Sequence, residues 1–340
     1  MPLVLVVGGL FGDEGKGKVS ASLSALLSPS IAARTGATNA GHTVVHRGER
    51  WKLRALPAAA VTSPGSLLVI ARGALVHLAV LLREARSLGV LDRVKVDYQT
   101  GIITEEHVER EKRDRRLMEE IGSTGTGVGM AMVDRVLRRL RLARSYPELQ
   151  GLLADTQQLL LDALDRGETV LAEATQGYWL SLYHGTYPYV TSRDTTAAAA
   201  LSELGLGPRH VDRIVLVAKA YMTRVGAGPL PGELAPEEAA RRGWTEYGTV
   251  TGRPRRAAPL DTGMLRRAAR ANTATDLAVT KLDKLFPETR CIRSWDQLPR
   301  RARQWLEELE DAIGVPVTIV STGEDTECTA YNPEAWSTKS

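Results

Sequence analysis

The residues with the most evident chemistry lie near the N-terminus, in the sequence GDEGKGK at residues 12–18. An apolar run at residues 3–7 precedes this loop, and a helix-like run at residues 19–27 follows it. A strand, a glycine-rich loop and a helix in this order are typical of a phosphate-binding loop, in which backbone N–H groups and lysines hold a polyphosphate. Lys16 and Lys18 therefore indicate a nucleotide ligand.

The loop departs from both standard phosphate-binding templates. Its glycines have the wrong spacing for GxGxxG. The pattern GxxxxGK[ST] almost fits, but Val19 stands where a hydroxyl would bind magnesium. The loop also carries two acids of its own, Asp13 and Glu14.

An aspartate beside nucleotide phosphates is repelled unless it binds a cation or takes part in proton transfer. Asp13 can do both, with one oxygen on magnesium and the other facing a substrate N–H. We expect Lys16 to offset the charge of Asp13. The loop thus predicts an enzyme that uses a nucleoside triphosphate and deprotonates a second substrate beside the γ-phosphate.

The elements that must position these residues alternate along the chain. Apolar runs predict strands at residues 3–7, 67–71, 94–98, 169–173, 214–218, 277–281 and 317–321. Helical periodicity occupies residues 75–88, 105–120, 155–166, 264–271 and 299–313. This alternation predicts an α/β fold with a mostly parallel, doubly wound sheet, built as one domain over residues 1–340. The unusual loops follow strands, which predicts one composite site at the carboxyl edge of the sheet.

Composition excludes several other classes of protein. The 340 residues are 43% hydrophobic and 25% charged, as in ordinary globular proteins. No apolar run approaches the roughly 18 residues of a membrane span, and no cleavable leader is evident, so we expect a cytoplasmic protein without membrane contact. The net charge of +4 is scattered, which argues against nucleic acid. Cys291 and Cys328 lie in no CxxC or Cys/His cluster, so we expect two thiols and neither a disulfide framework nor a zinc site.

Further motifs join the loop in a recognisable series. They are TNAGHTVV (38–45), IGSTGTGVG (121–129), HGTYPYVTS (184–192), TRVGAGPLPGEL (223–234), GTVTGRPRR (248–256) and TKLD (280–283). In this order and over nearly the whole chain, the sequence resembles adenylosuccinate synthetase, in the compact form of the archaeal enzymes. Related bacteriophage enzymes share this size.

The resemblance implies that GTP hydrolysis drives the joining of IMP and L-aspartate into adenylosuccinate, with a 6-phosphoryl-IMP intermediate. Asp13 matches the general base that removes the N1 proton of IMP. His42 matches the general acid that stabilises charge on the transferring phosphoryl group. Asp13 and the Gly41 carbonyl would hold Mg²⁺. Arg138 matches an arginine that reaches the IMP phosphate of a neighbouring subunit, which implies a homodimer.

The remaining binding roles follow the family motifs position by position. The resemblance implies GTP contacts at Gly12, Asp13, Glu14, Gly15, Lys16, Gly17, Lys18, Gly41, His42, Thr43, Arg255, Lys281, Leu282, Asp283, Ser321, Thr322 and Gly323. It implies IMP contacts at Asp13, Lys16, Asn39, Ala40, Gly41, His42, Thr124, Arg138, Gln176, Thr191 and Arg253. It implies aspartate contacts at Thr249, Val250, Thr251, Gly252, Arg253 and Arg255. In this set the Asp283 carboxylate would accept hydrogen bonds from guanine N1 and N2.

Two alternatives stay open at this point. Leu10 and Phe11 replace the Gln and Trp usual in the family, which leaves purine selectivity undecided. The phage relatives act on dGMP and make the 2-amino product, although retention of Asp13 favours IMP. The second alternative is a regulatory GTP-binding module without ligase chemistry, but Val19 breaks its usual phosphate loop and it gives TNAGHT and GTVTGRPRR no role.

Overall fold

The computed structural model describes residues 2–249 and 252–336. Within these ranges ten strands form one sheet, and every neighbouring pair is parallel except the edge pair β15–β16. Across the sheet the strands are β16 (Thr329–Tyr331), β15 (Val317–Ser321), β14 (Asp276–Thr280), β11 (Arg213–Lys219), β1 (Leu3–Gly8), β10 (Val170–Glu173), β2 (Ile31–Arg34), β5 (Leu67–Ile70), β7 (Val94–Asp97) and β9 (Leu153–Ala154). The predicted α/β fold with a mostly parallel sheet is confirmed.

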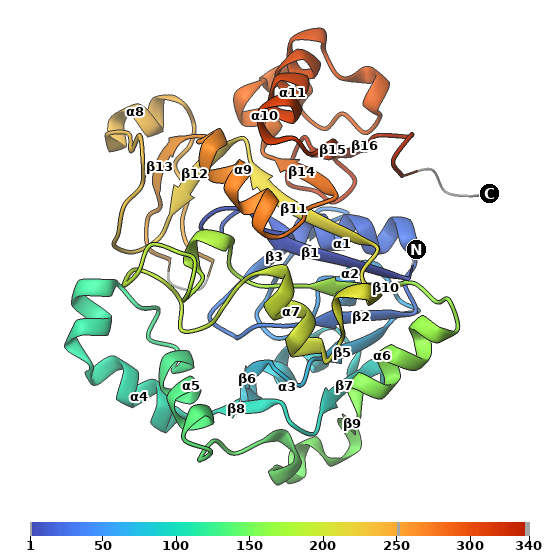
Figure 1. Ribbon diagram of the computed structural model, residues 1–340, viewed down its shortest axis with the longest axis vertical. Helices are drawn as coiled ribbons and strands as arrows, with labels where there is room; N and C mark the ends of the chain where they lie inside the picture. The colour runs from blue at the N-terminus through green and yellow to red at the C-terminus, as the bar shows by residue number, and fades with distance from the viewer. Residues whose placement is uncertain (1, 250–251, 337–340) are drawn as a thin grey trace.

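Helices cover both faces of this sheet (Figure 1). Alternate residues of β1 show why: Leu3 and Leu5 belong to one apolar core, whereas Val4 and Val6 belong to another. The second core contains the buried side of α1 (Lys16–Leu27). The first contains side chains of α3 (Leu78–Ser87), α6 (Thr156–Asp165), α7 (Ala197–Leu204), α9 (Thr262–Ala271) and α11 (Arg300–Ile313). The sheet is therefore doubly wound, as the sequence predicts.

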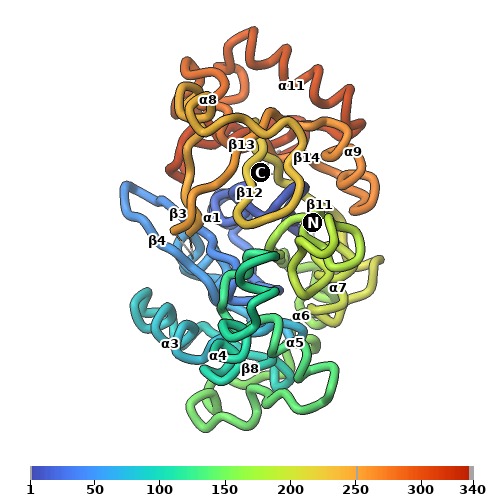
Figure 2. Tube along the Cα trace, turned by 90° about the vertical axis from the view of Figure 1, so that its left-hand side faces the viewer, coloured from blue at the N-terminus to red at the C-terminus, as the bar shows by residue number. Residues whose placement is uncertain are grey.

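Smaller elements extend from the sheet towards the two ends of the molecule. Two-stranded ribbons are formed by β3 (His42–His46) with β4 (Glu49–Leu53), β6 (Leu75–His77) with β8 (Gly101–Ile103), and β12 (Tyr221–Arg224) with β13 (Arg256–Pro259). The short helices are α2 (Ala59–Thr62), α4 (Glu105–Arg113), α5 (Val128–Val136), α8 (Pro236–Arg241) and α10 (Leu282–Leu285). Figures 1 and 2 place α4 and α5 at one end of the long axis and α8 and α11 at the other.

Three local predictions need correction. The sheet also contains β2, β9 and β16, which the sequence did not predict. The four residues of β2, IAAR, include a single β-branched side chain, and β9 and β16 have only two and three residues. The helix predicted at residues 75–88 begins only at Leu78, because the residues before it pair with β8 as strand β6. The helix predicted at residues 105–120 breaks after α4 and resumes as a π-helix at Arg116–Ile121. No helix in the described part of the chain is long and apolar enough to cross a bilayer.

The expectation of two thiols is wrong. Cys291 and Cys328 are joined by a disulfide, with their Cα atoms 4.4 Å apart. The two cysteines are separated by 37 positions and share no motif, so spacing alone carried no signal. The fold brings them together, because Cys291 follows α10 and Cys328 lies in the turn between β15 and β16.

Candidate functional site

The loop between β1 and α1 is held in shape by its second acid. The Glu14 carboxylate accepts hydrogen bonds from the backbone N–H groups of Leu10 (2.9 Å) and Gly12 (2.8 Å). The same carboxylate pairs with the Lys16 ammonium at 2.7 Å, and both side chains are buried. The prediction that Lys16 offsets the charge of Asp13 is therefore wrong, since in the structure Lys16 neutralises Glu14.

Asp13 faces a different set of charges. Its Oδ1 lies 3.2 Å from an Arg255 guanidinium nitrogen, and its Oδ2 accepts a 3.4 Å hydrogen bond from Thr223. Arg255 also pairs with Glu246, which Lys219 contacts at 3.0 Å. Burial raises the pKa of Asp13, although Arg255 and Lys219 oppose this. Burial would also raise the pKa of Glu246, but Lys219 and Arg255 outweigh it and hold that pKa at about 2. Asp13 is thus the carboxylate of this group with the greater affinity for a proton.

His42 begins β3 and is buried against a fixed ion pair. Its Nδ1 is hydrogen-bonded to Glu173 and lies 3.0 Å from an Arg34 guanidinium nitrogen. Arg34 and Glu173 contact each other at 2.6 Å, and Glu173 also accepts from the Ala58 N–H at 2.9 Å. Burial, with help from Arg34, lowers the pKa of His42 to about 4 in spite of Glu173. The ring is therefore neutral near pH 7.

The proton on the neutral ring has a defined position. The carboxylate at Nδ1 requires a proton there, so Nε2 carries the lone pair. The ring lies beside the phosphate loop: a Cβ added to Gly17 would come within 2.6 Å of the His42 Cβ, so only glycine fits at this crossing. The fold therefore fixes His42 next to the N-terminus of α1.

The second lysine of the loop points away from the loop. Lys18 Nζ donates to Ser321 Oγ at 2.6 Å and to the carbonyl oxygens of Gly323 (2.5 Å) and Cys328 (2.8 Å). Burial lowers the pKa of Lys18 to about 7, although nearby Asp283 opposes this. The side chain thus joins α1 to the turn after β15, and only the backbone of Lys18 stands at the phosphate loop.

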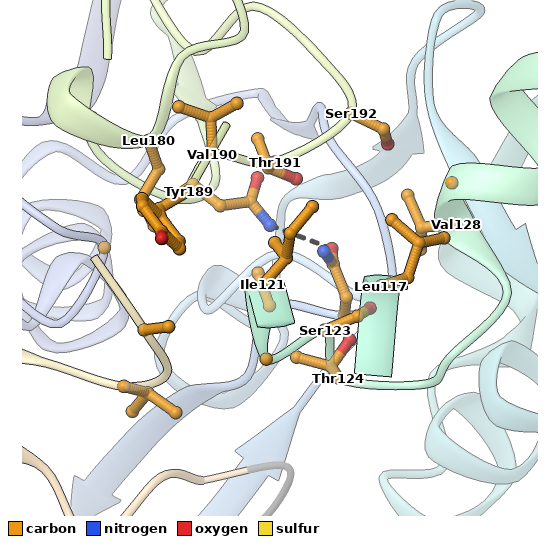
Figure 3. Close-up of a pocket in the computed structure, with 18 of the residues that line it drawn as sticks. Leu117, Ile121, Ser123, Thr124, Val128, Leu180, Tyr189, Val190, Thr191 and Ser192 are labelled. Atoms are coloured by element: carbon orange, nitrogen blue, oxygen red, sulfur yellow. Dashed lines mark hydrogen bonds between the residues drawn. The ribbon is translucent and has the colours of Figure 1, made fainter. Parts of the chain in front are cut away.

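A cavity of about 540 Å³ opens beside Asp13. Segments far apart in sequence line it, and Figure 3 shows Thr191 on one side with Ser123 and Thr124 opposite. The sequence-predicted residues that line it are Gly12, Asp13, Asn39, Ala40, Gly41, Thr124, Gln176, Thr191, Thr249, Arg253 and Arg255. The amide of Gln176 donates to Asn39 Oδ1 at 2.8 Å, which fixes two of these polar groups relative to each other.

Other predicted residues lie outside this cavity. Arg138 is exposed just beyond α5. The residues expected to bind guanine form a separate group, in which Asp283 follows β14, Ser321 ends β15, and Thr322 and Gly323 come directly after it. The Asp283 Oδ1 atom is buried and has no hydrogen-bond partner among the described residues. Val250 and Thr251 lie outside the described residues, while the neighbouring Thr249 hydroxyl is 3.5 Å from that of Thr43.

Sequence reasoning missed several charged residues of the site. Arg224, which lines the cavity, stood inside a quoted motif but received no role. Its guanidinium lies 4.6 Å above the Phe11 ring and donates to the Tyr189 carbonyl at 2.7 Å. Glu173 carried no signal, because it acts through His42, which is distant in sequence. Glu246 lies nine positions before its partner Arg255, but it stands in none of the quoted motifs.

Comparisons with known proteins agree on one family. The adenylosuccinate synthetase family model matches residues 5–144 and 140–288. Adenylosuccinate synthetases of Pyrococcus horikoshii and Archaeoglobus fulgidus are 47% and 46% identical to this chain over 331 and 324 residues. The alignments cover 96% and 95% of this chain, and 97% and 96% of the relatives.

Solved structures show the same fold. Fully ligated adenylosuccinate synthetase from Plasmodium falciparum matches 98% of this chain and 100% of its own, with a TM-score of 0.90 at 24% identity. Cyanophage S-2L succinoaminodeoxyadenylate synthetase, solved with dGMP and with dATP as an energy donor, gives a TM-score of 0.81 at 27% identity. That match covers 98% of this chain and 95% of the phage chain.

Proposed function

The chain belongs to the adenylosuccinate synthetase family, a family of GTP-dependent ligases, and from this premise we propose how its residues join IMP to L-aspartate. One observation carries the assignment of the site. Asp13, a partly buried carboxylate with a raised pKa, lines the same cavity as Asn39, Thr124, Gln176 and Thr191. A general base and the amides and hydroxyls suited to a purine therefore converge on one cavity.

In the first step Asp13 takes the proton from N1 of IMP. The O6 atom then attacks the γ-phosphorus of GTP, so that an O6–P bond forms while the bond from phosphorus to the GDP oxygen breaks. His42 starts as a neutral ring with Nε2 unprotonated. The arriving phosphates favour a second proton on the ring, which then donates from Nε2 to the charge that develops on the phosphoryl group.

In the second step the amine of L-aspartate attacks C6, and the O6 atom leaves with phosphate. Arg253 and Thr249 line the cavity and are our candidates for holding the aspartate carboxylates, since a guanidinium binds a carboxylate in a bidentate manner. Arg255 pairs with Asp13 in the structure, so we propose that it moves towards the triphosphate when GTP binds.

The donor atoms around Asp13 fit a magnesium ion. The Asp13 carboxylate and the Gly41 residue line the same cavity, and oxygen atoms are the ligands that Mg²⁺ prefers. No cluster of three or more His, Cys, Asp or Glu side chains in the described ranges could hold a metal alone. Few protein ligands are usual where substrate phosphates supply the rest. When bound, the ion would neutralise charge on the β- and γ-phosphates, held by Asp13 and the Gly41 carbonyl.

We assign the triphosphate of GTP to the loop between β1 and α1. We assign its guanine base to the residues at the carboxyl ends of β14 and β15. Gly12, Gly15 and Gly17, with the backbone of Lys16 and Lys18, would surround the phosphates. Lys281, Leu282, Asp283, Ser321, Thr322 and Gly323 would hold guanine. The orphaned Asp283 Oδ1 supports this, because a buried acceptor without a partner is costly unless a ligand supplies the donor.

We further propose a homodimer in which Arg138 reaches the IMP phosphate of the partner subunit. Its exposed position outside the cavity of its own chain supports this assignment. The reaction is placed in the cytoplasm, where its nucleotide substrates are made and used.

The phage-type reaction with dGMP is not favoured. The chain retains Asp13, and its relatives at 43–47% identity are archaeal adenylosuccinate synthetases. To test the function, purified protein is incubated with GTP, Mg²⁺ and L-aspartate plus IMP, GMP or dGMP in parallel. We expect adenylosuccinate from IMP and little product from the other two. Faster product formation from dGMP would establish the phage-type reaction, and GTP hydrolysis unaffected by IMP would establish a GTPase.

A further inference from the structure

The turn between β15 and β16 is fastened from several directions. Lys18 on α1 donates to Ser321, Gly323 and Cys328. The Thr326 N–H donates to the Val45 carbonyl at 2.7 Å. These contacts hold the turn against α1 and β3, on the side towards the phosphate loop.

The disulfide fastens this turn on its other side. Cys328 is buried, and its carbonyl accepts from the Thr322 N–H at 3.0 Å. The Cys291 N–H donates to the Thr322 carbonyl at 2.8 Å. Gly323 packs directly on the bridge, because a Cβ added there would lie 3.1 Å from the Cys328 Cβ and 3.3 Å from its sulfur.

The bridge therefore joins the two segments to which we assign guanine. One segment runs from Asp283 on α10 to Cys291, and the other runs from Ser321 to Cys328. In contrast, none of the residues that line the cavity beside Asp13 belongs to either segment. A change at the bridge should thus alter the binding of the guanine base of GTP and leave the binding of IMP unchanged.

Without the disulfide bond, the backbone at Cys291 would be free to leave an unfavourable conformation. Cys291 has a φ of 57°, a left-handed conformation that residues other than glycine seldom adopt. Cys291 is also an exposed residue, whereas Cys328 is buried, so we expect a soluble reductant to approach the bridge at Cys291. Thr322 is hydrogen-bonded to the backbone of both cysteines, and Gly323 packs on Cys328, so a shift of either cysteine would be passed to these two residues.

We propose that the Cys291–Cys328 disulfide is a positioning element of the guanine site, and that a dithiol reductant lowers the affinity for guanine nucleotide by opening it. A dithiol thiolate attacks the Cys291 sulfur, the S–S bond breaks, and Cys328 leaves as a thiolate that takes up a proton. The second dithiol sulfur then attacks the mixed disulfide and releases the Cys291 thiolate, which is protonated in turn. The two cysteines are reduced, and the reagent is oxidised to its cyclic disulfide.

The proposal rests on the proposed function, because the guanine site is assigned there. The test uses the purified full chain with and without dithiothreitol. Alkylation with iodoacetamide and intact mass first report the state of the cysteines. Calorimetry with GDP and Mg²⁺ then measures base-side affinity, and steady-state kinetics give KM for GTP and for IMP. Reduction should raise the Kd for GDP and the KM for GTP by about 3- to 10-fold, the range of one lost hydrogen-bonded contact. The KM for IMP should stay unchanged.

A double variant, Cys291→Ser with Cys328→Ser, is the matched control. It should behave like the reduced chain and no longer respond to dithiothreitol. If iodoacetamide alkylates both cysteines before any reduction, no disulfide is present and the proposal fails. It fails equally if a chain that makes product has the same Kd for GDP in its oxidised and reduced states. Either result would leave the proposed function standing. No GTP-dependent product and no GDP binding in the oxidised chain would instead overturn the proposed function, and the positioning role with it.

Discussion

At the scale of the residue, the two acids of the phosphate loop have separate tasks. Glu14 accepts two loop N–H groups and neutralises Lys16, so it builds the loop. Asp13 points into the cavity and contacts Arg255. The sequence singled out Asp13 because its carboxylate is anomalous beside phosphates, and in the structure Asp13 lines the cavity. It could not separate the partners of the two acids, since Arg255 comes from a distant loop.

Replacing Asp13 by asparagine should abolish ligation. The amide keeps the size of the side chain but cannot accept the N1 proton, and a general base contributes roughly 10²–10⁴-fold. Product formation is measured by steady-state assay, and GDP binding by calorimetry, which should remain detectable. Near-normal turnover by Asp13→Asn would remove Asp13 from the mechanism.

Replacing His42 by asparagine should reduce kcat with little effect on KM. Stabilisation of a developing negative charge is worth on the order of 10²–10³-fold. Glu173→Gln is a matched variant, because it removes the carboxylate at Nδ1 but leaves the ring in place. It should lower kcat in the same direction by a smaller factor. Changes confined to KM in both variants would make His42 a binding residue.

At the scale of the element, apolar runs predicted the strands well where β-branched residues gather, as in β1 and β15. They failed for β2, whose alanines become a central strand only because β10 and β5 pair with it. The same limit applies to Lys18. Its place in the motif predicts a phosphate ligand, but the tertiary contacts of α1 with the turn after β15 decide where its ammonium lies.

Those contacts predict a pH-dependent stability. The pKa of Lys18 is about 7 in the folded chain against 10.5 as the ordinary value. Between these pH values the unfolded chain holds a proton that the native chain lacks, so raising the pH through this window favours the native state. The contribution to the free energy of unfolding has a slope of up to about 1.4 kcal/mol per pH unit.

Lys18→Met should remove this contribution. Urea unfolding of the wild type and of the variant is compared at pH values from 7 to 10.5, the window set by the two pKa values. The difference in unfolding free energy, wild type minus variant, should increase with pH. A difference that stays constant across the window would show that Lys18 keeps its proton in the fold.

At the scale of the whole molecule, the parallel sheet explains why distant motifs meet. The loops after β1, β10 and β11 open at the same edge, so residues such as Gln176 and Arg224 reach the cavity of Asp13. The motifs quoted from the sequence contain most of the residues that line this cavity, although the sequence assigned a role to only eleven of them. They did not reveal the disulfide or the charge network of Glu246, because neither has a local pattern in the sequence.

The proposed dimer makes a prediction about mixed subunits. An Arg138→Leu chain should lack only the arginine that it gives to the IMP site of its partner. An Asp13→Asn chain should lack only the general base of its own site. Mixing the two inactive proteins should restore activity, because one site of each heterodimer has every group. Random mixing gives about half heterodimers, so roughly a quarter of wild-type activity per subunit is the maximum. Tagged chains verify the exchange, and complete exchange without recovered activity would rule out a shared site.

In the proposed mechanism the 6-oxygen of IMP attacks GTP before the amine of aspartate attacks C6. The most direct test supplies IMP labelled with ¹⁸O at position 6, together with GTP, Mg²⁺ and L-aspartate, and analyses the released phosphate by mass spectrometry. We expect one ¹⁸O atom in the phosphate for each adenylosuccinate formed. Unlabelled phosphate would show that water, and not IMP, receives the γ-phosphoryl group, and would contradict the mechanism.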